Sequence, residues 1–244
     1  DPWAVLAVGD LTFVGDEVFV NTSRPVVIGR EVFLTQRSMI VTHNIGHSVL
    51  EGFENRFAPV VLEDMAQVGL ATVVYAGCRI GARAIVGSNS YVVADVPEGA
   101  FAVGVPARVS GRAQVDLSRR RQVELAHRMV EDFAELLALR GHDVESVEDG
   151  PLRGLSVVVD DQPALVAFVE RLDAGFRVPD GFGPVVVMTL ELAAEPPAGV
   201  AVLDLLGHTL SGEGGVVLDA ARELCRKRGI RFEPGPWRYG GGLI

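Results

Sequence analysis

The sequence predicts a parallel β-helix of about four coils over residues 1–112, followed by a helix and a small α+β domain over residues 113–244. Two observations support this prediction. An aliphatic residue recurs at every sixth position through much of the first hundred residues, and after residue 116 the apolar spacing changes to three and four. A period of six fits neither an α-helix nor an alternating strand. It fits a coil of three short strands joined by turns.

The aliphatic positions sort into three columns, one for each edge of a triangular coil. The columns are Val8, Ile28, Leu62 and Ile80; Val14, Leu34, Val68 and Val86; and Val20, Ile40, Val74 and Val92. We expect each residue to point inward and to stack on its counterpart about 4.8 Å away. Glycine follows half of them, where we expect tight turns with positive φ. A β-sandwich of alternating strands is the alternative, and the unbroken triplets disfavour it.

A second regularity accompanies the first. Four residues after each aliphatic stands a small or β-branched residue, and only Arg24 and Asn44 break this rule. Cys78 occupies one of these inward positions, which predicts a role in core packing. The two cysteines give no disulfide framework.

The long break of the repeat lies between Ile40 and Leu62, so residues 46–61 are expected to form an extruded loop. Long loops within a compact repeat are usually functional. His43 and His47 stand directly before or at the start of this loop. The break is therefore the first place to look for chemistry.

The remainder of the chain reads as a linker followed by mixed elements. Residues 110–115 are small and polar, and residues 116–140 form an amphipathic helix with Asp116 or Ser118 as N-cap and Gly141 just past its end. Strands are expected at 154–159, 185–192 and 199–206, helices at 163–174 and 215–228, and a turn-rich tail at 234–242. This region resembles no family that we recognise.

Composition narrows the class of protein. The net charge of −10 argues against nucleic acid or an anionic membrane as a partner, because phosphate binding needs a basic face. No apolar run approaches the roughly 20 residues that span a bilayer, and no signal peptide is evident, so we expect a cytoplasmic protein. The chain begins at Asp1 rather than Met, which leaves open that it is a fragment of a larger protein.

The end of the repeat carries a family resemblance. The turn Asp95-Val96-Pro97 and the segment from Gly104 to Arg108, which reads GVPAR, are similar to the closing coil of sugar and maltose O-acetyltransferases. Residues 5–112 thus resemble the left-handed parallel β-helix acyltransferases of the hexapeptide-repeat class. The resemblance implies a homotrimer that moves a short acyl group, acetyl above all, from acetyl-CoA or another acyl-CoA to a hydroxyl or amine of a sugar-like or natural-product acceptor.

The same resemblance assigns a general base. His43 matches the catalytic histidine that precedes the extruded loop in that family, where it takes the proton of the attacking acceptor. Histidine suits this step because its unperturbed pKa is ~6.5. His47 either orients the acceptor or is simply solvated. No metal site is expected, because a catalytic zinc needs three protein ligands and the repeat holds no third histidine.

Binding residues follow by position. The resemblance places Leu70 and Ser88 beside the pantetheine arm of CoA, and Arg108, assisted by Arg112, beside its phosphates. For the acceptor, the loop offers Glu51, Glu54, Asn55 and Arg56 between Phe53 and Phe57. The two aromatic rings either pack on a sugar ring or fasten the loop, and Glu51 is a candidate to orient the His43 ring.

Two alternatives stay open. Gln67 stands where the family commonly has tryptophan, and Val93-Ala94 where it has a Thr-Lys pair that contacts CoA. An acyl carrier protein as donor, within a larger biosynthetic assembly, would need fewer such cations. The other alternative is a non-catalytic trimeric scaffold. The acyl group, the acceptor and the role of residues 113–244 are not fixed by the sequence.

Overall fold

The computed structural model describes residues 2–232, and the chain divides into two compact units, Asp1–Asp116 and Leu117–Ile244. The expected tail at 234–242 lies outside the described residues. Within the described residues no helix is both long and apolar enough to cross a bilayer.

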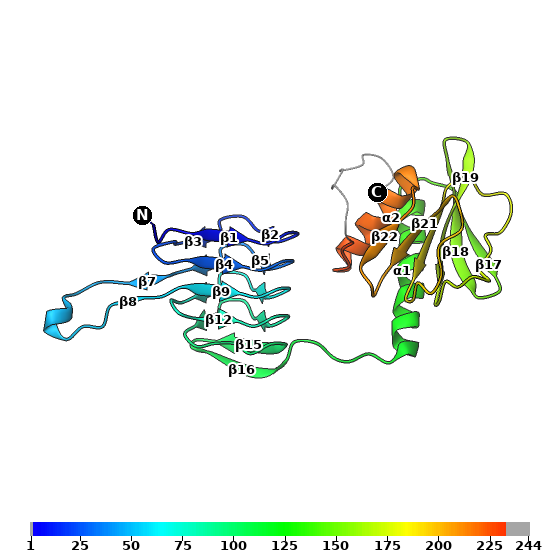
Figure 1. The fold of residues 1–244 in the computed structure, drawn as a ribbon. Coiled ribbons are helices and arrows are strands. Elements are labelled where there is room, and N and C mark those ends of the chain that lie inside the picture. The colour runs from blue at the N-terminus through cyan, green and yellow to red at the C-terminus, as the bar shows by residue number, and fades with distance from the viewer. Residues whose placement is uncertain (1, 233–244) are drawn as a thin grey trace. The chain divides into compact units, whose positions relative to one another are not determined.

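Three narrow sheets form the sides of the first unit, with one short strand per coil (Figure 1). The first sheet contains β1 (Leu6–Val8), β4 (Val26–Ile28), β9 (Val60–Leu62) and β12 (Arg79–Ile80). The second contains β2 (Phe13–Val14), β5 (Phe33–Leu34), β10 (Gln67–Val68), β13 (Ile85–Val86), β15 (Ala100–Gly104) and β16 (Ala107–Arg112). The third contains β3 (Phe19–Val20), β6 (Met39–Ile40), β11 (Val73–Val74) and β14 (Tyr91–Val92). All pairs between coils are parallel, and β16 closes the stack as an antiparallel partner of β15.

The strand register confirms the three predicted columns. Ile28 pairs with Val8 above and Leu62 below, and the other two columns continue in the same way. From the second coil onward these side chains are buried in the interior of the stack. Val8 and Val14 keep the predicted register but are 51% and 53% exposed, because nothing in the described part of the chain packs above the first coil.

The repeat glycines serve a purpose different from the predicted one. None of the six that follow an aliphatic has a positive φ. A Cβ added to Gly69 would instead lie 2.5 Å from the backbone nitrogen of Ser88 in the next coil. Close approach between coils therefore excludes a side chain there. The positive φ falls two residues later, at non-glycine positions such as Leu11, Glu31 and Arg83.

The break in the repeat forms an arm rather than an irregular loop. β7 (His43–Asn44) pairs antiparallel with β8 (Arg56–Phe57), and a short 3-10 turn, Val49–Glu51, lies between them. The expected boundary of 46–61 was wrong at its end, because Val60 and Val61 already pair with β4. The arm, residues 43–57, projects from the stack of coils (Figure 1).

The second unit is a six-stranded mixed sheet with both helices, α1 and α2, packed on one face. Its elements are α1 (Arg119–Leu139), β17 (Val144–Asp149), β18 (Leu152–Val159), β19 (Gln162–Val169), β20 (Val185–Thr189), β21 (Val200–Asp204), β22 (Thr209–Ser211) and α2 (Gly215–Lys227). Ser118 caps α1 by accepting the Arg121 amide, as predicted, and Gly141 follows with a φ of 86°. The predicted linker was wrong over residues 110–112, which belong to β16.

The helix predicted at 163–174 was wrong, because this segment is β19. Asp160 and Asp161 both have positive φ, which is the geometry of a two-residue hairpin turn, and they return the chain beside β18. Residues 164–169 are all buried because cores cover both faces of this central strand. A strand buried on both faces shows no alternation, and its continuous apolar run resembles a buried helix.

Candidate functional site

The coils place the predicted site residues at three different corners of the β-helix. The His43 corner joins the third sheet to the first and contains turns 21–25 and 75–78 and, between them, the base of the arm. The Leu70 corner joins the second sheet to the third at turns 69–72 and 87–90. The Arg83 corner joins the first sheet to the second at turns 81–84 and 97–99.

Asn21, one coil above, holds the His43 ring. Its Oδ1 lies 2.9 Å from His43 Nδ1, and it accepts hydrogen bonds from the Thr42 hydroxyl at 2.6 Å and the Ser23 amide at 3.3 Å. Because the Ser23 amide can only donate, the Asn21 atom that faces the ring is the oxygen. Neutral His43 therefore carries its proton on Nδ1, which leaves the lone pair of Nε2 available to accept a proton.

A stack of rings covers this histidine. The Phe57 ring lies 5.5 Å from the His43 ring, with an interplanar angle of 16°. Arg24 places its guanidinium carbon 4.9 Å from the centre of the Phe57 ring and 5.5 Å from that of Trp3. His43 and Phe57 are cross-strand partners in the arm, so the base of the arm fixes both rings.

Arg56 turns away from this stack. Arg56 is the cross-strand partner of Asn44, so its side chain lies on the face of the β7–β8 pair opposite to His43 and Phe57. On that face it lies over the coil below. A Cβ added to Gly77 would come within 2.6 Å of Arg56 Nη2, and the guanidinium carbon lies 6.0 Å from the Tyr75 ring centre. Arg56 therefore fastens the arm to the coil.

The other predicted acceptor residues lie farther along the arm. His47 contacts Phe53, with ring centres 4.6 Å apart, and both are exposed. Glu51 ends the 3-10 turn and is exposed, whereas Asn55 is half-buried beside β8. Asn21, rather than the candidate carboxylate Glu51, contacts the His43 ring.

The predicted donor residues gather at the Leu70 corner, with one exception. The Asn89 amide donates to the Leu70 carbonyl, so Leu70 and the Ser88 turn are neighbours in adjacent coils. Arg108 pairs with Val103 beside the turn that holds Gly104, whose amide donates to Ser90 Oγ. Leu70, Ser88 and Arg108 are all exposed there.

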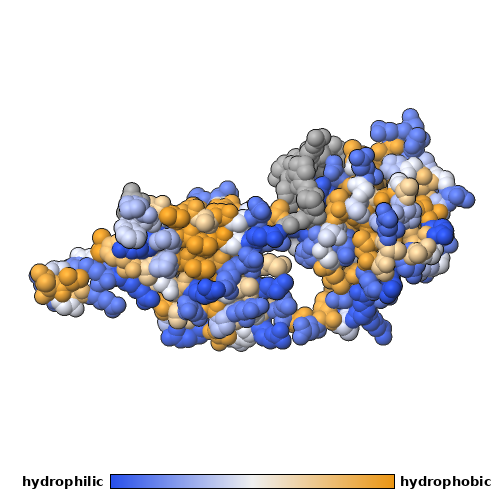
Figure 2. Space-filling model, viewed as in Figure 1, coloured by the Kyte–Doolittle hydropathy of each residue, from blue (hydrophilic) through white to orange (hydrophobic). Residues whose placement is uncertain are grey.

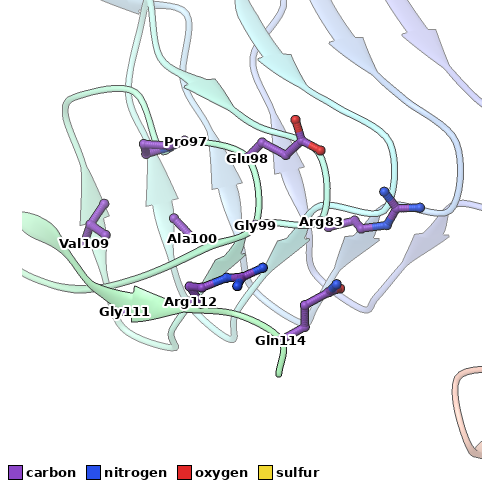
Figure 3. A pocket seen from close by; sticks show the side chains of 9 residues that line it. All are labelled: Arg83, Pro97, Glu98, Gly99, Ala100, Val109, Gly111, Arg112 and Gln114. Carbon is purple, nitrogen blue, oxygen red and sulfur yellow. The ribbon is translucent and has the colours of Figure 1, made fainter. Parts of the chain in front are cut away.

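Arg112 is the exception, because it lies at the far end of β16. It lines a cavity of about 490 Å³ at the Arg83 corner, together with Arg83, Glu98, Gln114 and neighbouring backbone (Figure 3). Its guanidinium forms a long ion pair of 3.6 Å with Asp116. The structure thus separates Arg112 from Arg108.

Neither cysteine has the properties of a nucleophile. Burial raises the pKa of the Cys78 thiol, and it raises the pKa of Cys225 to about 12. Residues 2–232 bring no three His, Cys, Asp or Glu side chains together in a metal-binding arrangement.

Sequence reasoning missed Asn21 and gave Arg24 no role. Asn21 lies 22 residues before His43, and only the stacking of coils brings the two together. Arg24 did leave a signal, because it breaks the small-residue rule of the repeat. That signal marked the corner where the candidate base lies.

Sequence comparison finds similar proteins for part of the chain only. No protein-family model matches it. Curated relatives include the 2,3,4,5-tetrahydropyridine-2,6-dicarboxylate N-acetyltransferases of Staphylococcus aureus strains JH9 and JH1, each 35% identical over 75 residues. The match covers 31% of this chain and 31% of each relative, so the chain spans about a third of the length of the curated relatives it matches.

Solved structures with a similar fold include two of a hexapeptide-repeat acetyltransferase from Vibrio cholerae, one of them in complex with acetyl coenzyme A. Both are 29% identical with a TM-score of 0.42, and they cover 45% and 46% of this chain and 64% and 62% of those chains. A maltose O-acetyltransferase from Clostridium difficile is 22% identical, with a TM-score of 0.36 and coverage of 45% and 67%. Its six-residue repeat and its coil-by-coil parallel pairing make the first unit of this chain a parallel β-helix, and the hexapeptide-repeat acetyltransferases are the proteins that this unit resembles.

Proposed function

We propose that the protein is an acyltransferase that moves an acetyl or other short acyl group from coenzyme A to a hydroxyl or amine, with His43 as the general base. The observation that carries the proposal is the contact between His43 Nδ1 and Asn21 Oδ1, which leaves Nε2 as a proton acceptor at the long break of the repeat. The acetyltransferase relatives support the same reaction class.

The proposed chemistry needs a single proton acceptor. His43 Nε2 takes the proton of the acceptor hydroxyl or amine as that group attacks the thioester carbonyl. The tetrahedral intermediate then collapses, the carbon–sulfur bond breaks, and the imidazolium returns its proton to the leaving thiolate. Asn21 Oδ1 accepts the hydrogen bond from Nδ1–H throughout and stabilises the transient charge on the imidazolium.

The proposed site requires two copies of the chain. His43 and the Leu70 corner lie on different edges of one β-helix, so a groove that contains both takes His43 from one copy and Leu70, Ser88 and Arg108 from a neighbour. A homotrimer supplies three such grooves.

Exposed apolar side chains support association of this unit. Phe13, Phe19, Val27 and Met39 point outward from the sheets and are exposed. The arm ends in exposed apolar residues as well, with Leu50 95% exposed (Figure 2). Of the four residues on the sheets, Phe19 and Met39 are neighbours on the third sheet, and adjacent exposed apolar side chains of this kind are common at interaction sites.

Donor binding tests the proposal without knowledge of the acceptor. Excess acetyl-CoA should raise the thermal midpoint by several degrees, since a ligand at 100 times its Kd stabilises by about 2.7 kcal/mol. Arg108→Ala should reduce the rise, because it removes a cation from the Leu70 corner, whereas Arg171→Ala, in the second unit, should leave it unchanged.

The same measurement separates the alternatives. If acetyl-CoA does not raise the thermal midpoint but the protein binds an acylated carrier protein, the donor is the carrier protein rather than CoA. A midpoint that neither donor raises would leave the first unit as a scaffold for the second.

A further inference from the structure

Arg24 stands at the His43 corner, where the repeat places small side chains elsewhere. Its backbone amide donates to the Thr42 hydroxyl at 3.1 Å, which ties the Arg24 turn to the residue next to His43. The Arg24 side chain is half-buried against the arm. At this position of the repeat, a cation therefore replaces the usual small residue and lies beside the candidate base.

The guanidinium of Arg24 packs against two aromatic rings, and its Nε–Nη2 edge makes no hydrogen bond within residues 2–232. The Phe57 and Trp3 rings lie against it, and the Phe57 ring also stacks on His43. Nη1 donates to the Ser23 carbonyl at 2.9 Å. Within residues 2–232 no carboxylate lies within ion-pair distance of Arg24, and Nε and Nη2 make no hydrogen bond.

That arrangement matches anion recognition. A guanidinium packed against two aromatic rings loses little further freedom on binding, and its Nε–Nη2 edge fits a carboxylate or phosphate through two parallel hydrogen bonds. Partial burial strengthens such a pair relative to one in open solvent. Other arginines, such as Arg37 and Arg171, already pair with carboxylates.

We propose that Arg24 binds a carboxylate or phosphate group of the acceptor, so that the acceptors of this protein are anionic hydroxyl or amine compounds. This inference rests on the proposed function, because it takes His43 as the base beside which the acceptor lies. Arg24 is then a specificity-determining residue, and Phe57 aligns its guanidinium with the imidazole.

The test compares pairs of sugar acceptors in which only one member carries an anionic group. D-Glucosamine with D-glucosamine 6-phosphate, and D-galactose with D-galacturonate, are assayed for CoA release from acetyl-CoA. The anionic member should have a kcat/KM at least about tenfold higher, the size of one charged hydrogen bond. Arg24→Gln should abolish the preference, Arg24→Lys should retain part of it, and Arg83→Gln, at another corner, should leave it intact.

Three results would overturn the proposal. These are equal use of the charged and neutral members by the wild type, a preference that survives Arg24→Gln, and an effect of Arg24→Gln on the KM of acetyl-CoA alone. The last would assign the anion to the phosphates of the donor.

A binding measurement separates this inference from the proposed function. Calorimetric titration with D-glucosamine 6-phosphate and with inorganic phosphate needs no turnover. Binding that Arg24→Gln abolishes, in a protein that transfers no acetyl group, would support the anion site and reject the acyltransferase. Transfer without any preference for anions would do the reverse.

Discussion

Asn21 fixes the tautomer of His43. A histidine on a flexible arm would exchange between two tautomers, whereas the Asn21 oxygen fixes the proton on Nδ1 and leaves Nε2 as the acceptor. The Ser23 amide and the Thr42 hydroxyl in turn fix the orientation of the Asn21 amide. The proposed base therefore depends on a residue one coil away.

Replacement of Asn21 should separate catalysis from donor binding. Asn21→Ala removes the acceptor of the Nδ1 proton, so we expect kcat to fall by about tenfold or more while the KM of acetyl-CoA stays unchanged. Nitrogen-15 NMR of the imidazole should report mixed tautomers in the variant. Asn44→Ala, whose exposed side chain lies beside His43 in sequence, is the control, and an equal loss in both variants would contradict the role of Asn21.

At this scale the sequence could predict His43 but not its surroundings. His43 stands at a visible break in the repeat, whereas the Asn21 contact exists only after two coils stack. Arg24 was visible as an exception to the repeat, but its environment comes from Phe57 and Trp3, which lie far from it in sequence.

Each coil of the β-helix depends on close approach to the next. The inward aliphatic residues could be predicted because a period of six has one geometric solution, and the strand register follows it. The role of the glycines could not be predicted, because the distance between coils is a tertiary property. The helix prediction for residues 163–174 was wrong for a related reason. Cores cover both faces of this strand, so its sequence lacks the alternation that identifies a strand.

A side chain at a repeat glycine should weaken the stack. Gly69→Ala places a methyl group against the backbone of Ser88, so we expect a loss of about 1–3 kcal/mol in the stability of the first unit. Urea unfolding followed by circular dichroism measures this loss. Gly111→Ala, where an added Cβ meets nothing within 4 Å, should change stability by less than about 0.5 kcal/mol. Equal effects would show that chain flexibility, not close approach, sets the requirement.

The whole molecule combines a β-helix that carries the candidate site with a separate mixed sheet and two helices. The apolar columns of the sequence predict the β-helix of a single copy. They do not reveal that the candidate site residues lie on different edges of that β-helix. We therefore expect a trimer in solution. Light scattering should give three times the mass of one chain, and a monomer that still transfers acetyl groups would contradict the shared groove.

The most direct test of the proposed function is the rate of CoA release from acetyl-CoA by wild type, His43→Gln and His47→Gln. The acceptors are the glucosamine and galactose pairs named above. The buried cysteines permit detection of free CoA with a thiol reagent. We predict that His43→Gln lowers the rate by ~100-fold or more but retains the rise in thermal midpoint with acetyl-CoA. The rate of His47→Gln should stay within about tenfold of the wild-type rate. Transfer by His43→Gln at the wild-type rate would contradict the assignment of His43 as the base.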